Sequence, residues 1–249
     1  MLVKVLPVFL NIPSILILFL FFGALTPPKK QGAQQQNQPP VVKLINPKNN
    51  SLFDWNAPLN YEITVADKED GNSKYEEINA KEVLLEVQYA ADKTKLQAIL
   101  NKGLQTDPAG LAVIRLSNCF NCHNFNSKSI GPSFFDISKR YTPSKRNVDT
   151  LVKRIREGSS GIWVKEKMPT HPELSVEETK EAVLWILKNG ADPAINYYTG
   201  LQGVFKIKQP NPSAKKGIYI LTASYTDHGI KGVPGNRLKG QDAIVIYSK

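Results

Sequence analysis

Two cysteines and a histidine stand together in the run Cys119-Phe120-Asn121-Cys122-His123, a C-x-x-C-H pattern. Two thiols three positions apart can reach the two vinyl groups of one porphyrin, and a histidine directly after the second thiol falls under the iron as its proximal ligand. The pattern is the attachment signature of a c-type haem. We therefore predict one covalently bound haem c, attached through Cys119 and Cys122, with His123 as an axial ligand.

Other chemistries of paired cysteines are alternatives. A structural disulfide, a thioredoxin-like redox pair and half of a zinc site would each use two nearby thiols. A zinc site lacks its second pair, because the chain contains only two cysteines. The thioredoxin-like interpretation lacks the strand-then-helix setting that it needs, and neither it nor the disulfide requires His123.

A six-coordinate haem needs a second axial ligand, and the chain offers few candidates. Apart from the initiator, Met168 is the only methionine, and it follows His123 by 45 positions. It stands in Lys167-Met168-Pro169, an expected loop, where a methionine that merely fills the core is less expected. A thioether is a soft ligand that raises the reduction potential when paired with histidine. We expect Met168 to be the sixth ligand, and His171 is its rival.

Residues 107 to 190 resemble a class I cytochrome c. The likeness rests on the C-x-x-C-H run and on a series of later residues, namely Ile130-Gly131-Pro132, Tyr141, Gly158, Gly161-Ile162-Trp163, Met168-Pro169 and a closing helix at 175–189. The resemblance implies that the carbonyl of Pro132 accepts the Nδ1–H of the proximal histidine and so fixes the ring. It also implies that Tyr141 and Trp163 pack near the haem or its propionates.

Three helices are predicted in this segment. Asp107-Pro108 is expected to cap the first, which leads through Leu111 and Ile114 to the cysteines. The second has apolar residues at i, i+3, i+4 and i+7 and ends at Gly158; these residues are Val148, Leu151, Val152 and Ile155. Ser175-x-x-Glu178 is a capping box for the last helix, which should turn Val183, Ile186 and Leu187 inward and close at Asn189-Gly190.

The segments on both sides have the period of two that is typical of β-strands. Alternation marks 41–45, 61–65 and 83–89 before the helices, and 205–207, 217–225 and 243–247 after them. Neither set is large enough for its own core, but together they have the size of one immunoglobulin-like sandwich. The stretches 39–47, 65–71 and 217–227 also resemble bacterial Ig-like or PKD-type domains. We predict a multidomain α + β protein, in which an all-α cytochrome c domain is inserted into an all-β Ig-like sandwich; two separate β units are the alternative.

The predicted domains follow from these boundaries. Residues 1–26 are a signal peptide or membrane anchor, because 5–25 are apolar and almost uncharged, long enough to span a bilayer, and lack an A-x-A cleavage pattern. Residues 27–40 are a flexible linker, 41–104 and 193–249 are the two parts of the sandwich, and 105–192 are the cytochrome domain. The expected location is the periplasm, since the family implies haem attachment outside the cytoplasm, with anchoring to the inner membrane as an open alternative.

The formal net charge is +10, which falls to +7 when the first thirty residues with Lys4, Lys29 and Lys30 are removed. Basic residues are concentrated in 139–156, which could be a solvated helix face or a docking surface for an acidic redox partner. Nucleic-acid binding is not expected, because no aromatic residues interleave with the basic ones. The run Asp67-Lys68-Glu69-Asp70-Gly71 could bind calcium but is more typical of a polar turn, and His228 is expected to be an exposed loop residue.

The sequence therefore predicts an exported mono-haem electron carrier and no enzyme. Proteins with this resemblance pass electrons from a dehydrogenase to a terminal oxidase, so redox proteins are the expected partners. One alternative is a five-coordinate haem that turns over peroxide or senses a gas, if Met168 does not bind the iron. Another is a glycan- or protein-binding module in which the haem is an accessory. No nucleophile–base pair, phosphate loop or paired-carboxylate site is evident in the sequence.

Overall fold

The computed structural model describes residues 36–102, 106–209, 216–233 and 235–249, and residues 36–249 form one compact unit. The predicted signal peptide or anchor, and the linker as far as residue 35, lie outside the described residues. No helix among the described residues is long and apolar enough to cross a membrane. The end of the predicted linker contacts the folded unit, because the side chain of Asn37 donates to Asp227 at 2.8 Å.

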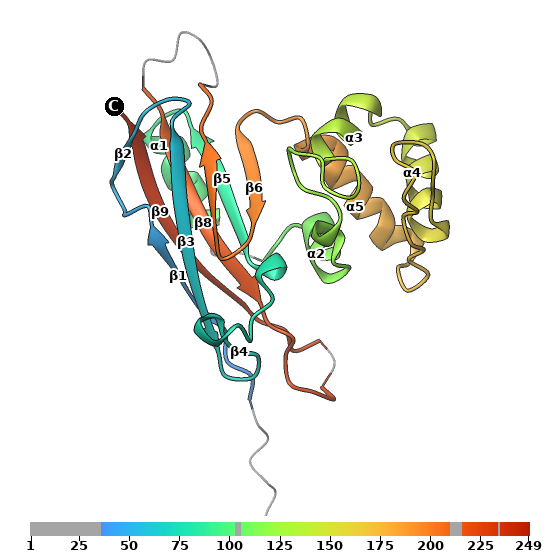
Figure 1. Ribbon diagram of the computed structural model, residues 1–249, viewed down its shortest axis with the longest axis horizontal. Helices are drawn as coiled ribbons and strands as arrows, with labels where there is room; N and C mark the ends of the chain where they lie inside the picture. The colour runs from blue at the N-terminus through green and yellow to red at the C-terminus, as the bar shows by residue number, and fades with distance from the viewer. Residues whose placement is uncertain (1–35, 103–105, 210–215, 234) are drawn as a thin grey trace, which may run out of the picture. The chain divides into compact units, whose positions relative to one another are not determined.

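Nine strands form two sheets within the described residues (Figure 1). The first sheet contains β1 (Val41–Asn46), β3 (Pro58–Asp67), β4 (Gly71–Asn72) and β7 (Gln202–Lys206), with β3 pairing with the other three. The second sheet has the order β2-β9-β8-β5-β6, from β2 (Leu52–Phe53), β9 (Lys239–Ser248), β8 (Ile218–Thr226), β5 (Leu84–Ala90) and β6 (Ile195–Thr199).

Strands from both ends of the chain are mixed in both sheets. In the first sheet β3 pairs antiparallel with β7, from Pro58 opposite Lys206 to Glu62 opposite Gln202. In the second sheet β5 lies between β6 and β8. This pairing supports the expectation that the helical segment is inserted between strands of one sandwich. The likeness of that sandwich to Ig-like or PKD-type domains stays a prediction.

A single apolar core fills the space between the two sheets. The predicted alternation is confirmed in β3, where Tyr61, Ile63 and Val65 are buried and the residues between them face outward. They belong to the same buried cluster as Leu85 of β5 and Ile246 of β9. Burying apolar side chains of this size stabilises the fold by about 1.5–3 kcal/mol each. The strands before and after the helices contribute to this core together, so the core stabilises two packed sheets that neither set of strands could form alone.

Five α-helices lie between β5 and β6, namely α1 (Lys93–Lys102), α2 (Ala109–Leu116), α3 (Phe134–Arg140), α4 (Lys145–Glu157) and α5 (Val176–Asn189). The described chain also contains three 3₁₀ turns: η1 (Ser73–Tyr75) and η2 (Ala80–Glu82) before β5, and η3 (Cys119–Asn121) after α2. The predicted helices ending at Gly158 and opening with the capping box at Ser175 are confirmed as α4 and α5. Helix α1 and strand β6 were not expected from the sequence.

The expected cap of the first helix is wrong. Pro108 occupies the N-cap position of α2 and no side chain caps the helix. The carboxylate of Asp107 instead pairs with Arg115 at 2.9 Å and with Lys239 of β9 at 2.6 Å. Tertiary ion pairs have replaced the local hydrogen bond that the Asp-Pro pair suggested.

The helices and the second sheet share one apolar cluster, which holds the haem motif against the sandwich. Leu84 of β5 and Tyr197 of β6 are buried with Phe125 and Trp185 from the helical segment. The rings of Phe125 and Tyr197 lie 4.9 Å apart, and those of Trp185 and Tyr197 lie 5.3 Å apart. Figure 1 shows β6 beside α2 and α5, so the helices that carry the site rest on a sheet edge.

Candidate haem-binding site

The C-x-x-C-H run forms a tight turn directly after α2. Asn118 has a left-handed backbone (φ 55°), which ends the helix and begins η3 at Cys119. The amide of His123 donates to the carbonyl of Cys119 at 2.9 Å, and so the turn holds the histidine close to the first cysteine. Cys119, Cys122 and His123 all line the same pocket. The motif is therefore arranged as covalent haem attachment requires.

The geometry of His123 leaves one ring nitrogen free to bind a metal. Its Nδ1 lies 2.7 Å from the backbone carbonyl of Pro132. A carbonyl can only accept, so Nδ1 carries the proton and Nε2 keeps its lone pair. Burial lowers the pKa of His123 and favours the neutral imidazole. Phe134 stacks on the ring at 5.8 Å between centroids and 14° between planes, so the orientation of the ligand is fixed on several sides.

Gly131 allows the imidazole to lie directly against the backbone. A Cβ at this position would come within 2.5 Å of His123 Cε1 and 2.9 Å of Nδ1. No larger residue fits without moving the ring. The amide of Gly131 also donates to the carbonyl of Cys122 at 2.9 Å, which ties the segment before Pro132 to the haem motif.

Met168 reaches the pocket on a loop that returns to the end of α4. Ser159 and Met168 pair as an isolated antiparallel bridge, with the Met168 amide donating to the Ser159 carbonyl at 2.8 Å. Gly158 begins this loop with φ 78°, and a Cβ there would lie 2.8 Å from the Met168 carbonyl. Met168 lines the pocket together with His123 and both cysteines.

The rival ligand His171 is placed differently. It is absent from the residues that line the haem pocket. Its Nδ1 lies 2.7 Å from Glu173 Oε1, and its side chain is 18 % exposed. In this arrangement the methionine, and not the histidine, faces the space that a haem would fill.

The two aromatic residues of the predicted haem surroundings differ in their distance from the pocket. Trp163 lines the pocket, and Tyr141 packs edge-on against it at 6.4 Å without lining the pocket itself. Arg154 lines the pocket and donates to the hydroxyl of Tyr141 at 2.7 Å. Tyr141 therefore contacts two residues that line the pocket, Arg154 and Trp163.

The pocket fits a porphyrin in its chemistry. It is open to solvent, and the space inside it and at its mouth is about 1150 Å³. Its walls are mainly apolar and come from α2, α3, α4, α5 and the 159–168 loop; they include Val113, Ile114, Ile130, Phe134, Ile137, Leu151, Ile155, Val164, Val183 and Ile186. An apolar slot with two thiols and two axial-type ligands suits a haem.

The environment of the cysteines does not suit a reactive thiol pair. Burial raises the pKa of the Cys119 thiol to about 11. Redox-active and zinc-binding cysteines work as thiolates, and positive surroundings that lower the pKa favour them. Within the described part of the chain, no group of three metal-ligating side chains is arranged to hold an ion. The turn therefore does not support the thioredoxin-like or zinc alternatives.

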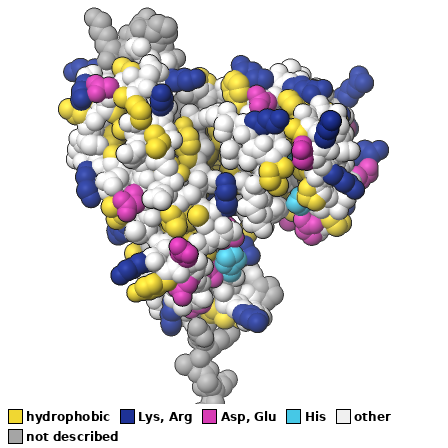
Figure 2. All heavy atoms as spheres, in the orientation of Figure 1, with side chains coloured by type: hydrophobic (Ala, Val, Ile, Leu, Met, Phe, Trp, Pro, Cys, Tyr) yellow, Lys and Arg dark blue, Asp and Glu magenta, His cyan; other side chains and the backbone are white. Residues whose placement is uncertain are grey.

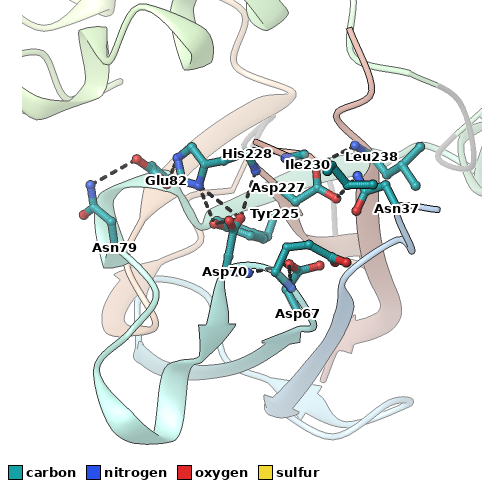
Figure 3. Close-up of polar contacts among 12 residues, drawn as sticks. Asn37, Asp67, Asp70, Asn79, Glu82, Tyr225, Asp227, His228, Ile230 and Leu238 are labelled. Carbon is teal, nitrogen blue, oxygen red and sulfur yellow. Dashed lines mark hydrogen bonds and ion pairs between the residues drawn. The ribbon is translucent and has the colours of Figure 1, made fainter. Parts of the chain in front are cut away.

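The acidic run at 67–71 is a polar turn that holds loops together (Figure 3). Asp67 Oδ1 accepts the amides of Glu69 and Asp70 at 3.0 and 2.8 Å. Asp70 Oδ2 accepts the hydroxyl of Tyr225 at 2.8 Å and the amide of His228 at 2.9 Å. His228 is an exposed loop residue, as expected, and its ring lies between Asp70 and Glu82.

Some basic residues of segment 139–156 form ion pairs with acidic side chains, and others do not. Lys145 and Lys153 of α4 pair with Asp149 and Glu157 one turn away. At the end of α3, Lys139 lies over Phe135 at 5.4 Å and Arg140 lies over Trp163 at 4.6 Å. Figure 2 shows basic side chains over the face of α3 and α4. The two cations at the end of α3 thus sit on aromatic rings, one of which, Trp163, lines the pocket.

The sequence pointed to most of these residues and missed the role of others. The resemblance named Pro132, Trp163 and both axial ligands, which line one pocket. It gave no role to Phe134 or Arg154. Phe134 stands two residues after Pro132, and its hydrophobicity was the only available signal. Arg154 was counted only as part of the basic segment.

Comparisons with known proteins find similar chains over about a third of the length. Cytochrome c-552 of Hydrogenobacter thermophilus is 33 % identical over 96 residues, covering 35 % of this chain and 97 % of the relative. Cytochrome c-551 of Azotobacter vinelandii is 35 % identical over 78 residues, covering 31 % and 94 %. The crystal structure of wild-type Nitrosomonas europaea cytochrome c552 is 31 % identical, with a TM-score of 0.30, and covers 31 % of this chain and 95 % of that one. No family model matches.

Proposed function

The chain belongs to the class I c-type cytochromes of the c-551 and c-552 kind through about a third of its length, and from that premise we propose that it carries single electrons through one haem bound by His123 and Met168. Cytochromes of this family bind haem c covalently. The observation that carries the proposal is that His123, Met168 and both cysteines line one apolar pocket, whereas His171 does not. Electron transfer between redox partners is the activity, and no bond-making reaction is assigned.

The haem, once attached, supplies an iron that accepts and gives up one electron. The chain's own residues hold the ligands in place and keep water out. Pro132 orients His123 through the 2.7 Å contact to Nδ1, and the Ser159–Met168 bridge holds the methionine loop. Ligands that stay fixed in both oxidation states keep rearrangement small, and an apolar pocket together with a methionine ligand raises the reduction potential.

Partners are proposed from the charge around the pocket mouth. Lys139 and Arg140 lie beside the exposed rings of Phe135 and Trp163. A partner with an acidic, partly apolar surface fits this combination, since opposite charge speeds encounter and apolar contact holds the complex. An electron-donating dehydrogenase and an accepting oxidase, both outside the cytoplasm, are the proposed partners. The apolar N-terminal residues 5–25 support export.

The axial ligands are tested by absorption spectra of the oxidised and reduced protein in wild type, Met168→Ala and His171→Ala. Wild type should show the weak far-red band of methionine bound to ferric iron, and Met168→Ala should lose it. His171→Ala is the matched control, since it removes a neighbouring ligand-type side chain and should keep the band. If wild type lacks the band and binds carbon monoxide or cyanide readily, the sixth position is open, and peroxide turnover or gas sensing replaces electron transfer.

A further inference from the structure

A second pocket lies where the haem-bearing turn meets the sandwich, apart from the haem pocket. The helical segment contributes Arg115, Leu116 and Phe120 to its lining, and the sandwich contributes Leu84, His228 and Arg237. The space inside it and at its open mouth is about 650 Å³. Pockets between folded units are frequent ligand sites, because two surfaces can present different groups to one molecule.

Arg115 forms the buried end of this pocket and belongs to a cluster of ion pairs. Arg115 and Lys239 both pair with the single carboxylate of Asp107, at 2.9 and 2.6 Å. The side chains of Arg115, Asp107 and Lys239 are 8, 10 and 20 % exposed. The other groups that the guanidinium contacts are neutral, namely the hydroxyl of Ser224 at 3.1 Å and the carbonyl of Glu82 at 3.3 Å. Of the three ionic groups only Arg115 lines the pocket, and it brings a positive charge to the pocket wall.

The rim adds two more cations. Lys81 and Arg237 line the pocket and are exposed. Neither makes an ion pair within the described residues. Because guanidinium and ammonium groups that converge on one cavity raise the local concentration of anions, the rim and the buried end favour the same sign of ligand.

The one carboxylate in the pocket wall is hydrogen-bonded through only one of its oxygens. Glu82 Oε1 accepts the side-chain amide of Asn79 at 3.2 Å, and Oε2 faces His228 Nε2 at 3.4 Å. The other ring nitrogen of His228 lies 3.0 Å from Asp70 (Figure 3). Glu82 is thereby held toward the imidazole, and Lys81 and Arg237 of the rim are the cations of the wall that make no ion pair within the described residues.

We propose that this pocket binds a small organic carboxylate between Arg237, Lys81 and the Arg115 end. Arginine suits a carboxylate because its fork of N–H donors can bond both oxygens. The apolar surface of Leu84, Leu116 and Phe120 would contact the carbon part of such a molecule, which an inorganic anion lacks. Asn118, Phe120 and Asn121 also line the pocket and flank the haem cysteines, so the bound anion lies beside the haem-bearing turn.

The test is calorimetric titration of the haem-loaded full chain with succinate, inorganic phosphate and chloride at constant ionic strength. Succinate should bind saturably and more tightly than phosphate, and chloride should give no saturable heat. Lys81→Gln with Arg237→Gln should weaken succinate binding at least tenfold. Lys43→Gln with Lys206→Gln is the matched control, since it removes two exposed lysines from the other sheet and should leave binding unchanged.

Several results would overturn the proposal. The absence of saturable binding by succinate removes the site, and phosphate that binds as tightly as succinate removes the assignment to an organic carboxylate. An equal loss of affinity in both double variants would mean that only net charge matters. The absorption spectrum tests the haem ligands independently of anion binding. If succinate does not bind, the electron-carrier proposal therefore still stands, and if Met168 does not bind the iron, the anion-site proposal still stands.

Discussion

Replacing Gly131 by alanine should displace the proximal histidine. The added Cβ would lie 2.5 Å from His123 Cε1, 2.9 Å from Nδ1 and 3.0 Å from Nε2, whereas carbon atoms in favourable contact are at least about 3.5 Å apart. The ring or the backbone must therefore move by about 1 Å. The ring has little freedom, because Pro132 holds Nδ1 and Phe134 stacks on its face.

The cost of Gly131→Ala can be worked out from these contacts. Overpacking of a filled interior costs about 1–3 kcal/mol, and a domain of this size loses about 2–4 °C of melting temperature per kcal/mol. We expect the melting temperature of the haem-loaded protein to fall by about 2–12 °C. The low-spin fraction in the ferric absorption spectrum should fall as well, because the imidazole can no longer approach the iron in its original orientation.

Gly161→Ala is the matched control for this experiment. Gly161 lines the same pocket, but a Cβ there meets nothing within 4 Å. Its φ of 73° makes alanine strained by about 1–2 kcal/mol, so stability should drop while the spectrum stays that of wild type. If Gly131→Ala keeps both the stability and the spectrum of wild type, the claim that the backbone at Gly131 locks His123 is refuted.

Three further experiments probe the junction and the docking surface. Arg115→Met should cost about 3 kcal/mol in chemical unfolding, because it breaks a buried pair, whereas Lys145→Ala at an exposed pair should cost less than about 0.5 kcal/mol; equal losses would contradict the buried role. Trp185→Ala should cost about 3–5 kcal/mol, because the ring is 7 % exposed and packs on both helices and sheet; a loss below about 1 kcal/mol would mean that the shared cluster is not needed. Lys139→Gln with Arg140→Gln should slow electron transfer to an acidic partner and flatten its dependence on salt, and an unchanged stopped-flow rate would place the docking surface elsewhere.

The pocket around the C-x-x-C-H run could be predicted in part because several of its residues are close in sequence. Cys119, Cys122 and His123 lie within one turn, and Pro132 comes nine residues later. Helix α5 was equally accessible, since Ser175 and Glu178 form a capping box and its buried residues recur at helical spacing. Each of these signals is contained in a few neighbouring residues, and no tertiary contact overrides it.

The features that sequence analysis missed depend on residues far apart in the chain. Asp107 looks like a helix cap but pairs with Lys239, 132 residues later. Strand β6 has no alternating pattern, because Tyr197 faces the helical core while its neighbours are only partly covered. Helix α1 is short and rich in lysine, and its apolar stripe is limited to Leu96, Ile99 and Leu100, which is less than the stripe by which a longer helix is recognised. Gly131 is visible in the sequence, but its contact with His123 appears only in three dimensions.

X-ray absorption at the iron edge tests the central claim most directly. In both the ferric and the ferrous protein, the account predicts one sulfur and five nitrogen ligands, the sulfur coming from Met168 and disappearing in Met168→Ala. An iron with only nitrogen or oxygen ligands in the wild-type protein, or with five ligands in either oxidation state, would contradict the assignment of a His123/Met168 electron carrier.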